Sequence, residues 1–101
     1  MIRHIVMWRL ADTDDKAEKA AAIKEGLEAL KDKIPEIVDI AVGININDSD
    51  SVSDIVLVSA FKTHDDLAAY IQHPAHKAIG ASAVKPNVVE RRVVDYEFEE
   101  K

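Results

Sequence analysis

Large apolar side chains occupy both faces of the strand-like segments in this 101-residue sequence. Residues 1–10 alternate with a period of two, which predicts a β-strand. Val6 and Trp8 lie on one face of that strand, and Ile5 and Met7 lie on the other. A sheet with one face in water would carry polar groups on that face. The pattern therefore predicts a sheet that protein covers on both sides.

Strand-like and helical segments follow one another in the order β-α-β-β-α-β. One apolar stripe with steps of three and four predicts the first helix; its members are Ala20, Ile23, Leu27, Leu30 and Ile34. The second helix begins at Thr63 and is interrupted at His73-Pro74. The predicted strands cover residues 1–10, 37–46, 54–62 and 88–98. The first helix is predicted over residues 11–33, and a short third helix over residues 75–84.

This order is typical of an α+β, ferredoxin-like sandwich, in which two helices cover one face of a four-stranded antiparallel sheet. One sheet face cannot absorb all the large apolar strand residues, which are Ile5, Met7, Ile55, Leu57, Val94 and Phe98. A bare apolar sheet of that size is unusual in a monomer. We therefore expect a second copy to pack face to face as a two-fold homodimer.

Composition excludes several classes of function. The 101 residues form one domain, and the lack of cysteine excludes disulfides, thiolate nucleophiles and cysteine-ligated metals. Three scattered glycines exclude the usual phosphate-binding loops, and the net charge of -6 argues against nucleic-acid binding. No apolar run approaches membrane-spanning length. The chain begins with strand-like sequence, so we expect no signal peptide and a cytoplasmic location.

Tyrosine and two histidines lie at steps of three in the segment Tyr70-Ile-Gln-His73-Pro-Ala-His76. An imidazole exchanges protons near neutral pH, and a nearby phenol can donate a hydrogen bond to an oxygen as charge develops there. This segment could therefore supply an acid–base pair. The alternative is structural: His73 caps the next helix, Tyr70 is a core aromatic residue, and His76 is solvated.

The same two histidines raise the question of a metal. His73 lies at a helix boundary, and zinc normally requires a third protein ligand. His4, His64, Asp54 or Asp95 would have to supply that ligand. Because neither the ligand count nor the geometry is established, we expect no metal.

His4 shares a face with Val6 and Trp8, and Asp95 lies on the last predicted strand. In a ferredoxin-like sheet the first and last strands pair antiparallel, which brings His4 and Asp95 toward the same end. A His–Asp hydrogen bond there would fix the imidazole tautomer. The alternative is a structural pair that holds the two strands together. Trp8 is expected in the core.

The arginines of the strands are expected to act as surface partners for the acidic residues of the chain and not to form an anion site. They are Arg3, Arg9, Arg91 and Arg92.

Several segments together resemble the stress-responsive dimeric α/β-barrel (Dabb) domain family. They are the opening IRHIVMWRL, Ile34-Pro35, Val42-Gly43, the run from Asp54 to Phe61, the Tyr70…His76 segment and Val94-Asp95-Tyr96. The resemblance covers essentially the whole chain, and the His-Pro-x-His element is its most specific part. It implies a ferredoxin-like fold in which two sheets face each other as a homodimeric barrel.

The functions of this family are mixed. Plant members include stress-associated and antimicrobial proteins, and one branch is a polyketide cyclase with cofactor-free acid–base aldol chemistry. The resemblance to that branch implies functional roles for Tyr70, His76 and His4. The branch has a histidine where this chain has Asp54, so an acidic cavity floor is expected here.

Three hypotheses follow. In the first, a pocket between sheet and helices binds a small, largely apolar, oxygenated molecule without a cofactor. Tyr70, His76 and His4 would act there as acid–base groups. The residues expected to contact the ligand are Val6, Trp8, His73, Asp54 and Asp95. The second hypothesis is a structural or stress-response dimer without catalysis, and the third is a cofactor-independent monooxygenase.

Overall fold

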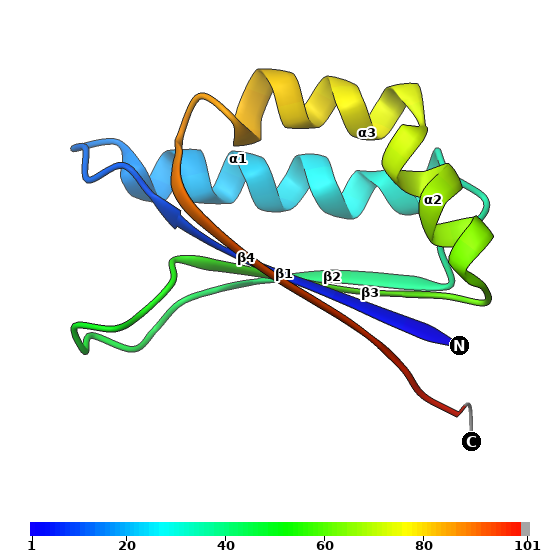
Figure 1. The fold of residues 1–101 in the computed structure, drawn as a ribbon. Helices are drawn as coiled ribbons and strands as arrows, with labels where there is room; N and C mark the ends of the chain where they lie inside the picture. The colour runs from blue at the N-terminus through cyan, green and yellow to red at the C-terminus, as the bar shows by residue number, and fades with distance from the viewer. Residues whose placement is uncertain (100–101) are drawn as a thin grey trace.

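A computed structural model describes residues 1–99 as a four-stranded antiparallel sheet with its helices on one side (Figure 1). The strands are β1 (Ile2–Leu10), β2 (Asp39–Ile44), β3 (Ile55–Phe61) and β4 (Val88–Glu97). The helices are α1 (Lys16–Glu28), α2 (His64–Gln72) and α3 (Pro74–Ile79). The strand order is β2-β3-β1-β4. This arrangement confirms the predicted ferredoxin-like, α+β fold.

β1 is a central strand, and its two faces differ as the alternation predicted. Ile2, His4, Val6, Trp8 and Leu10 are all buried under the helices. β3 and β4 flank β1, so that Val6 lies opposite Leu57 on one side and Val93 on the other. The core therefore forms between this face of the sheet and the helix layer.

The apolar stripe of the first helix is buried as predicted, but the helix is shorter than residues 11–33. α1 begins only at Lys16, and a 3-10 turn, Ala29–Asp32, follows it. The Thr13 hydroxyl donates to the Asp15 carboxylate at 2.7 Å, and the Ala11 amide donates to the Asn87 carbonyl at 2.8 Å. These bonds hold the segment before Lys16 as a turn, because short polar side chains compete with helical hydrogen bonding.

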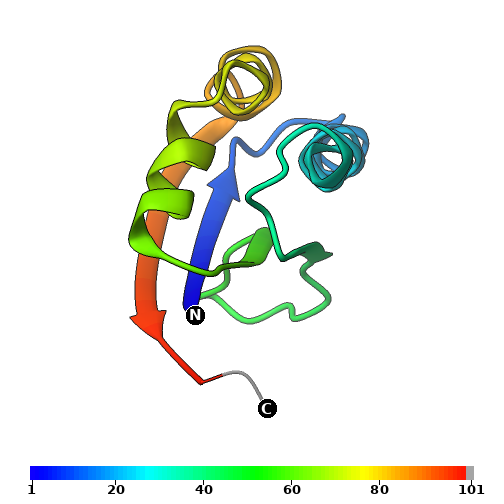
Figure 2. The same cartoon turned by 90° about the vertical axis from the view of Figure 1, so that its right-hand side faces the viewer.

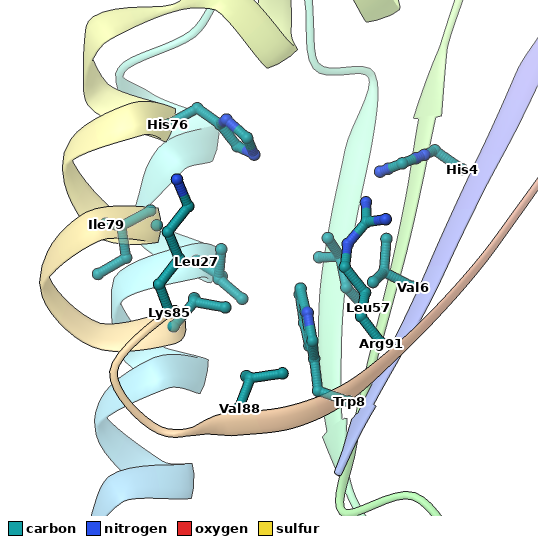
Figure 3. A pocket seen from close by; sticks show the side chains of 12 residues that line it. His4, Val6, Trp8, Leu27, Leu57, His76, Ile79, Lys85, Val88 and Arg91 are labelled. Atoms are coloured by element: carbon teal, nitrogen blue, oxygen red, sulfur yellow. The ribbon is translucent and has the colours of Figure 1, made fainter. Parts of the chain in front are cut away.

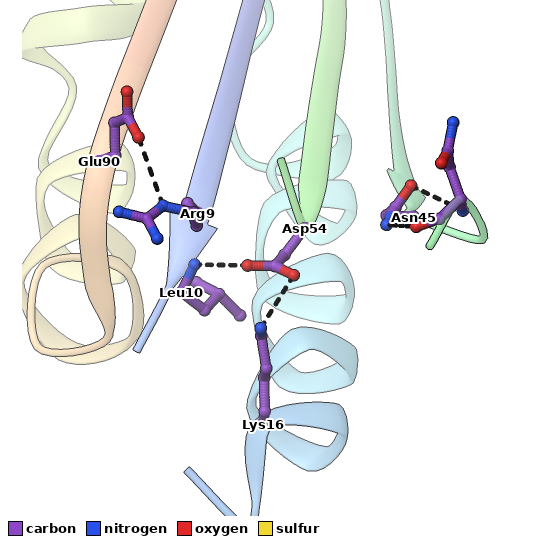
Figure 4. A network of polar contacts seen from close by, with 7 residues as sticks. Arg9, Leu10, Lys16, Asn45, Asp54 and Glu90 are labelled. Atoms are coloured by element: carbon purple, nitrogen blue, oxygen red, sulfur yellow. Dashed lines mark hydrogen bonds and ion pairs between the residues drawn. The ribbon is translucent and has the colours of Figure 1, made fainter. Parts of the chain in front are cut away.

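The second strand was predicted to reach Ile46, but β2 ends at Ile44. Beyond it, the Asn45 side-chain amide donates to the Asn47 carbonyl at 2.6 Å, and the Asn47 amide donates back to Asn45 Oδ1 at 2.9 Å (Figure 4). Asparagine favours such local turns. Ile46 consequently leaves the predicted core face and is fully exposed.

The interruption at His73-Pro74 places a separate helix beside α1. His73 is extended, with φ -63° and ψ 136°, and Pro74 opens α3, which continues into a π-helical turn, Gly80–Val84. α1 and α3 lie side by side over the sheet (Figure 2). Gly26 permits this close approach, because a Cβ atom there would overlap the Ile79 side chain.

The opposite face of the sheet carries apolar side chains with no cover among residues 1–99. Met7, Val94 and Tyr96 are 40%, 52% and 47% exposed. Ile5 lies between Val58 and Val94 in the strand register. We call these five residues and their neighbour Val56 the bare face.

Two of the large apolar strand residues lie on the other face. Ile55 and Leu57 belong to the helix-covered face and are buried. Phe98 lies just beyond β4 at the edge of the bare face, where the Arg3 guanidinium is 4.4 Å and the Tyr96 ring centre 6.4 Å from the centre of its ring.

Candidate functional site

A cavity of about 300 Å³ lies between the helix-covered face of β1 and the helical segment that ends in the Gly80–Val84 turn (Figure 3). Most of its lining is apolar and comes from β1, β3, α1, α3 and β4. The principal apolar side chains are Val6, Trp8, Leu27, Leu57, Ile79 and Val88. This volume is at the lower end of the range for small-molecule sites, which is roughly 300–1,000 Å³. Val6 and Trp8, which were predicted to contact a ligand, both line this cavity.

His76 faces the cavity from the first turn of α3 (Figure 3). Its Nδ1 lies 3.1 Å from the carbonyl oxygen of Ile71. A carbonyl only accepts hydrogen bonds, so Nδ1 carries the proton and Nε2 is left as a base. Burial lowers the pKa of His76, and the nearby charges of His4 and Arg91 lower it further, although the Ile71 bond opposes the shift. His76 is therefore neutral at pH 7.

His4 faces the same cavity from β1. It lies directly opposite Asp95 in the β1–β4 register, and its Nδ1 is 2.5 Å from Asp95 Oδ1. The predicted hydrogen bond between these strands is thus present. The imidazole is 6% exposed, whereas Asp95 is 41% exposed and does not line the cavity. Asp95 therefore orients His4 through Nδ1 and leaves Nε2 available to the cavity.

Tyr70 lies behind the two histidines in the core and does not line the cavity. Its ring centre is 4.5 Å from that of His76 and 6.2 Å from that of His4. Burial raises the pKa of Tyr70 to about 12, so the phenol stays protonated. Its hydroxyl is buried and has no hydrogen-bond partner within residues 1–99. Tyr70 thus contacts both imidazoles, and its ring fixes their positions.

His73 does not reach the cavity. Its Nδ1 accepts a hydrogen bond from the Ala75 amide at 3.0 Å, which makes it the N-cap of α3. The structural alternative, in which His73 caps the next helix, therefore describes its position, and His73 is not among the residues that line the cavity.

Asp54 does not form the floor of the cavity either. It lies just before β3, where its Oδ2 accepts from the Leu10 amide at 2.7 Å and its Oδ1 lies 3.1 Å from Lys16 Nζ (Figure 4). The carboxylate joins the end of β1 to the start of α1. The expectation of an acidic cavity floor was wrong, because the Asp54 carboxylate is held by the Leu10 amide and Lys16 and does not line the cavity.

Two cationic residues of the cavity were missed by the sequence analysis. Lys85 and Arg91 both line it, although Arg91 was expected to be a surface ion-pair partner. Strand parity could have revealed Arg91, because it shares a face of β4 with Val93 and Asp95 and lies opposite Trp8. Arg3, Arg9 and Arg92 do pair with carboxylates, as expected; their partners are Asp39 for Arg3 and Glu90 for the other two.

Residues 1–99 hold neither a metal-binding cluster nor a membrane-spanning helix. No group of three or more histidine, aspartate or glutamate side chains there is placed to hold a metal ion. In the same residues, no helix combines the length and the apolar character needed to cross a membrane.

Acid is expected to destabilise the protein through His76. Burial holds the pKa of His76 in the folded state below its ordinary 6.5, so below pH 6.5 the unfolded chain binds more protons than the folded chain. The free energy of unfolding therefore falls as the pH drops from 6.5 toward the lowered folded-state pKa. Urea unfolding at a series of pH values measures this dependence. His76→Gln should remove this part of the pH dependence. The control His64→Gln, at an exposed histidine, should keep it. Equal pH dependence of His76→Gln and the wild type would contradict the role of His76.

The chain matches known proteins along nearly its full length. Residues 2–98 match the model of the stress-responsive A/B barrel domain, Dabb. An uncharacterized protein of Streptomyces coelicolor is 32% identical over 99 residues, which are 97% of this chain and 100% of that protein.

Two solved structures are similar in sequence and fold. A dimeric, ferredoxin-like protein of unknown function from Bacteroides fragilis is 37% identical, with a TM-score of 0.88 over 96% of this chain and 95% of that one. A second dimeric ferredoxin-like protein of unknown function, from Thermobifida fusca, is 28% identical, with a TM-score of 0.84 over 96% and 90% of the two chains. Together with the domain match, these similarities establish that the chain belongs to the stress-responsive A/B barrel (Dabb) domain family.

Proposed function

We propose that this protein binds a small, largely apolar, oxygenated molecule in the cavity and transfers a proton at that molecule without a cofactor. One observation carries the proposal: His4 and His76 face the same cavity, and the Nδ1 of each is held by an acceptor, Asp95 Oδ1 and the Ile71 carbonyl. Each ring therefore offers Nε2 to a ligand. Surface histidines without such acceptors would not have a fixed tautomer.

The reaction that fits these groups is removal of a proton from a carbon next to a carbonyl. His76, neutral at pH 7 because burial lowers its pKa, accepts the proton on Nε2. The electron pair of the broken C–H bond moves toward the carbonyl oxygen, which becomes an enolate oxygen. His4 can donate a hydrogen bond or a proton to that oxygen from Nε2 when it is protonated, and Asp95 then stabilises the imidazolium through Nδ1.

Deuterium exchange tests the chemistry directly. Phenylacetone has acidic protons next to its carbonyl and a single aromatic ring suited to a small apolar cavity. In D2O, the protein should accelerate the loss of those proton signals in NMR spectra, and His76→Ala should reduce the acceleration about 100-fold, the lower end of general-base effects. His64→Ala removes an exposed imidazole and should leave the rate unchanged.

Two results would contradict the proposal. One is an exchange rate in the presence of the wild-type protein equal to that of buffer alone. The other is an equal rate for His76→Ala and the wild type, because the cavity imidazole would then not be the base.

We also propose that the protein acts as a homodimer in which two bare faces pack together. The exposed apolar surface around Ile5, Val58 and Val94 supports this assembly, and the related proteins of Bacteroides fragilis and Thermobifida fusca are dimeric. The cavity lies on the other side of the sheet, so dimer formation leaves its helix-covered lining in place.

A further inference from the structure

Lys85 and Arg91 bring two positive charges to a cavity that is otherwise mainly apolar. Lys85 ends the π-helical turn, and Arg91 lies on β4 opposite Trp8. Neither forms an ion pair with any carboxylate in residues 1–99. The chain has 19 acidic residues and a net charge of -6, so carboxylates are abundant. Two unpaired cations beside one cavity therefore leave positive charge for a ligand to neutralise.

The charged groups of the two cations lie toward the end of the cavity that holds His4 and His76, and they reach it from opposite walls (Figure 3). The Lys85 ammonium points toward His76, and the Arg91 guanidinium extends between Trp8 and His4 (Figure 3). The charge of Arg91 also contributes to the lowered pKa of His76, in keeping with its position in the lining. Trp8 and Val88 lie toward the other end (Figure 3). The lining is thus cationic at one end and apolar at the other.

We propose that this cavity selects small carboxylates that carry one aromatic ring or a short apolar chain. The carboxylate would lie between Lys85 and Arg91, and the apolar part would contact Trp8 and Val88. A guanidinium presents parallel N–H donors that match the two oxygens of a carboxylate, and an ammonium adds a point charge. This inference rests on the proposed function, because it specifies which class of molecule enters the same cavity.

The selectivity should come from local charge and not from the protein as a whole. The net charge of -6 repels anions at long range. Lys85 and Arg91 are both exposed to solvent, so salt will weaken their attraction for a carboxylate. We therefore expect a preference of about tenfold for an anionic ligand over its neutral isostere, equivalent to about 1.4 kcal/mol.

Trp8 provides a reporter for the test, because it is the only tryptophan and it lines the cavity. Phenylacetate and phenylacetamide have nearly the same size and shape, but only phenylacetate is charged. Each is titrated into the protein while the NMR signal of the Trp8 indole N–H is followed. Phenylacetate should bind about tenfold more tightly, and the preference should shrink when salt is added.

A charge-matched pair of variants assigns the preference to the two cations. Lys85→Met/Arg91→Met should bind both probes with similar affinity. Its retained affinity for phenylacetamide would show that the cavity is intact. Lys31→Met/Lys77→Met removes the same total charge from exposed positions outside the cavity lining and should keep the wild-type preference.

The outcomes separate the inference from the proposed function. If both probes shift the Trp8 signal with equal affinity, or if Lys85→Met/Arg91→Met keeps the preference, anion selection is overturned while ligand binding in the cavity stands. If neither probe shifts the signal, both the inference and the proposed cavity ligand are overturned.

Discussion

Ile5→Glu is expected to convert the proposed homodimer into a folded monomer. Ile5 lies in the middle of the bare face, between Val58 and Val94. If two such faces pack together, the substitution places a carboxylate from each copy in an apolar interface. An unpaired buried charge costs several kcal/mol, and two like charges across a two-fold axis add repulsion. The loss of association free energy should be large enough to dissociate a small homodimer at micromolar concentration.

Sedimentation velocity at micromolar concentration measures this result. The wild type should sediment as a species of twice the chain mass and Ile5→Glu as one of a single chain mass. Ile71→Glu adds the same charge at an exposed apolar residue of α2, away from the sheet, and should remain dimeric. A wild-type protein that sediments as a single chain, or a dimeric Ile5→Glu variant, would contradict the assembly through the bare face.

Substitutions of Tyr70 are expected to have opposite effects on stability. Tyr70→Ala removes a fully buried ring that contacts Phe61 as well as the two histidines. Truncation of a large buried aromatic side chain costs about 3–5 kcal/mol. Tyr70→Phe keeps the ring and removes a hydroxyl that has no partner within residues 1–99. Because an unpaired buried polar group costs about 1–3 kcal/mol, the phenylalanine variant should be more stable than the wild type.

Chemical denaturation at one fixed protein concentration measures both variants, because the stability of a dimer depends on concentration. A loss of stability in Tyr70→Phe would show that the hydroxyl has a partner outside the described contacts. The deuterium-exchange rate of the same variant gives a second result. An unchanged rate assigns Tyr70 a positioning role, whereas a large decrease means that its hydroxyl reaches the reacting molecule.

Local patterns predicted the elements well where side-chain spacing alone determines them. The alternation in β1 identified both of its faces, and the stripe from Ala20 to Ile34 identified the buried side of α1 and the turn after it. Burial of apolar surface imposes these periodicities on any strand or helix that borders a core. The pairing of His4 with Asp95 followed as well, because the topology fixes which strands are neighbours.

Predictions at the ends of elements were less accurate, because hydrogen bonds of individual side chains determine those ends. The Thr13–Asp15 contact delays the start of α1, and the Asn45–Asn47 contacts end β2 before Ile46. By apolar pattern alone, the segment before Lys16 could belong to α1 and the segment after Ile44 could belong to β2. The side-chain hydrogen bonds compete with that continuation, and sequence periodicity does not report them.

The sequence by itself determined the strand and helix order, the two-sided apolar strands and the presence of histidines suited to proton transfer. Only the tertiary structure decided which polar groups share a cavity. It brings His4 and His76 together with Lys85 and Arg91, while it binds the Asp54 carboxylate to the Leu10 amide and Lys16 and uses His73 as a helix cap. These residues come from β1, α3, a turn and β4, and their convergence depends on how the helices cross the sheet. That crossing is set by contacts such as Gly26 against Ile79, which no local pattern contains.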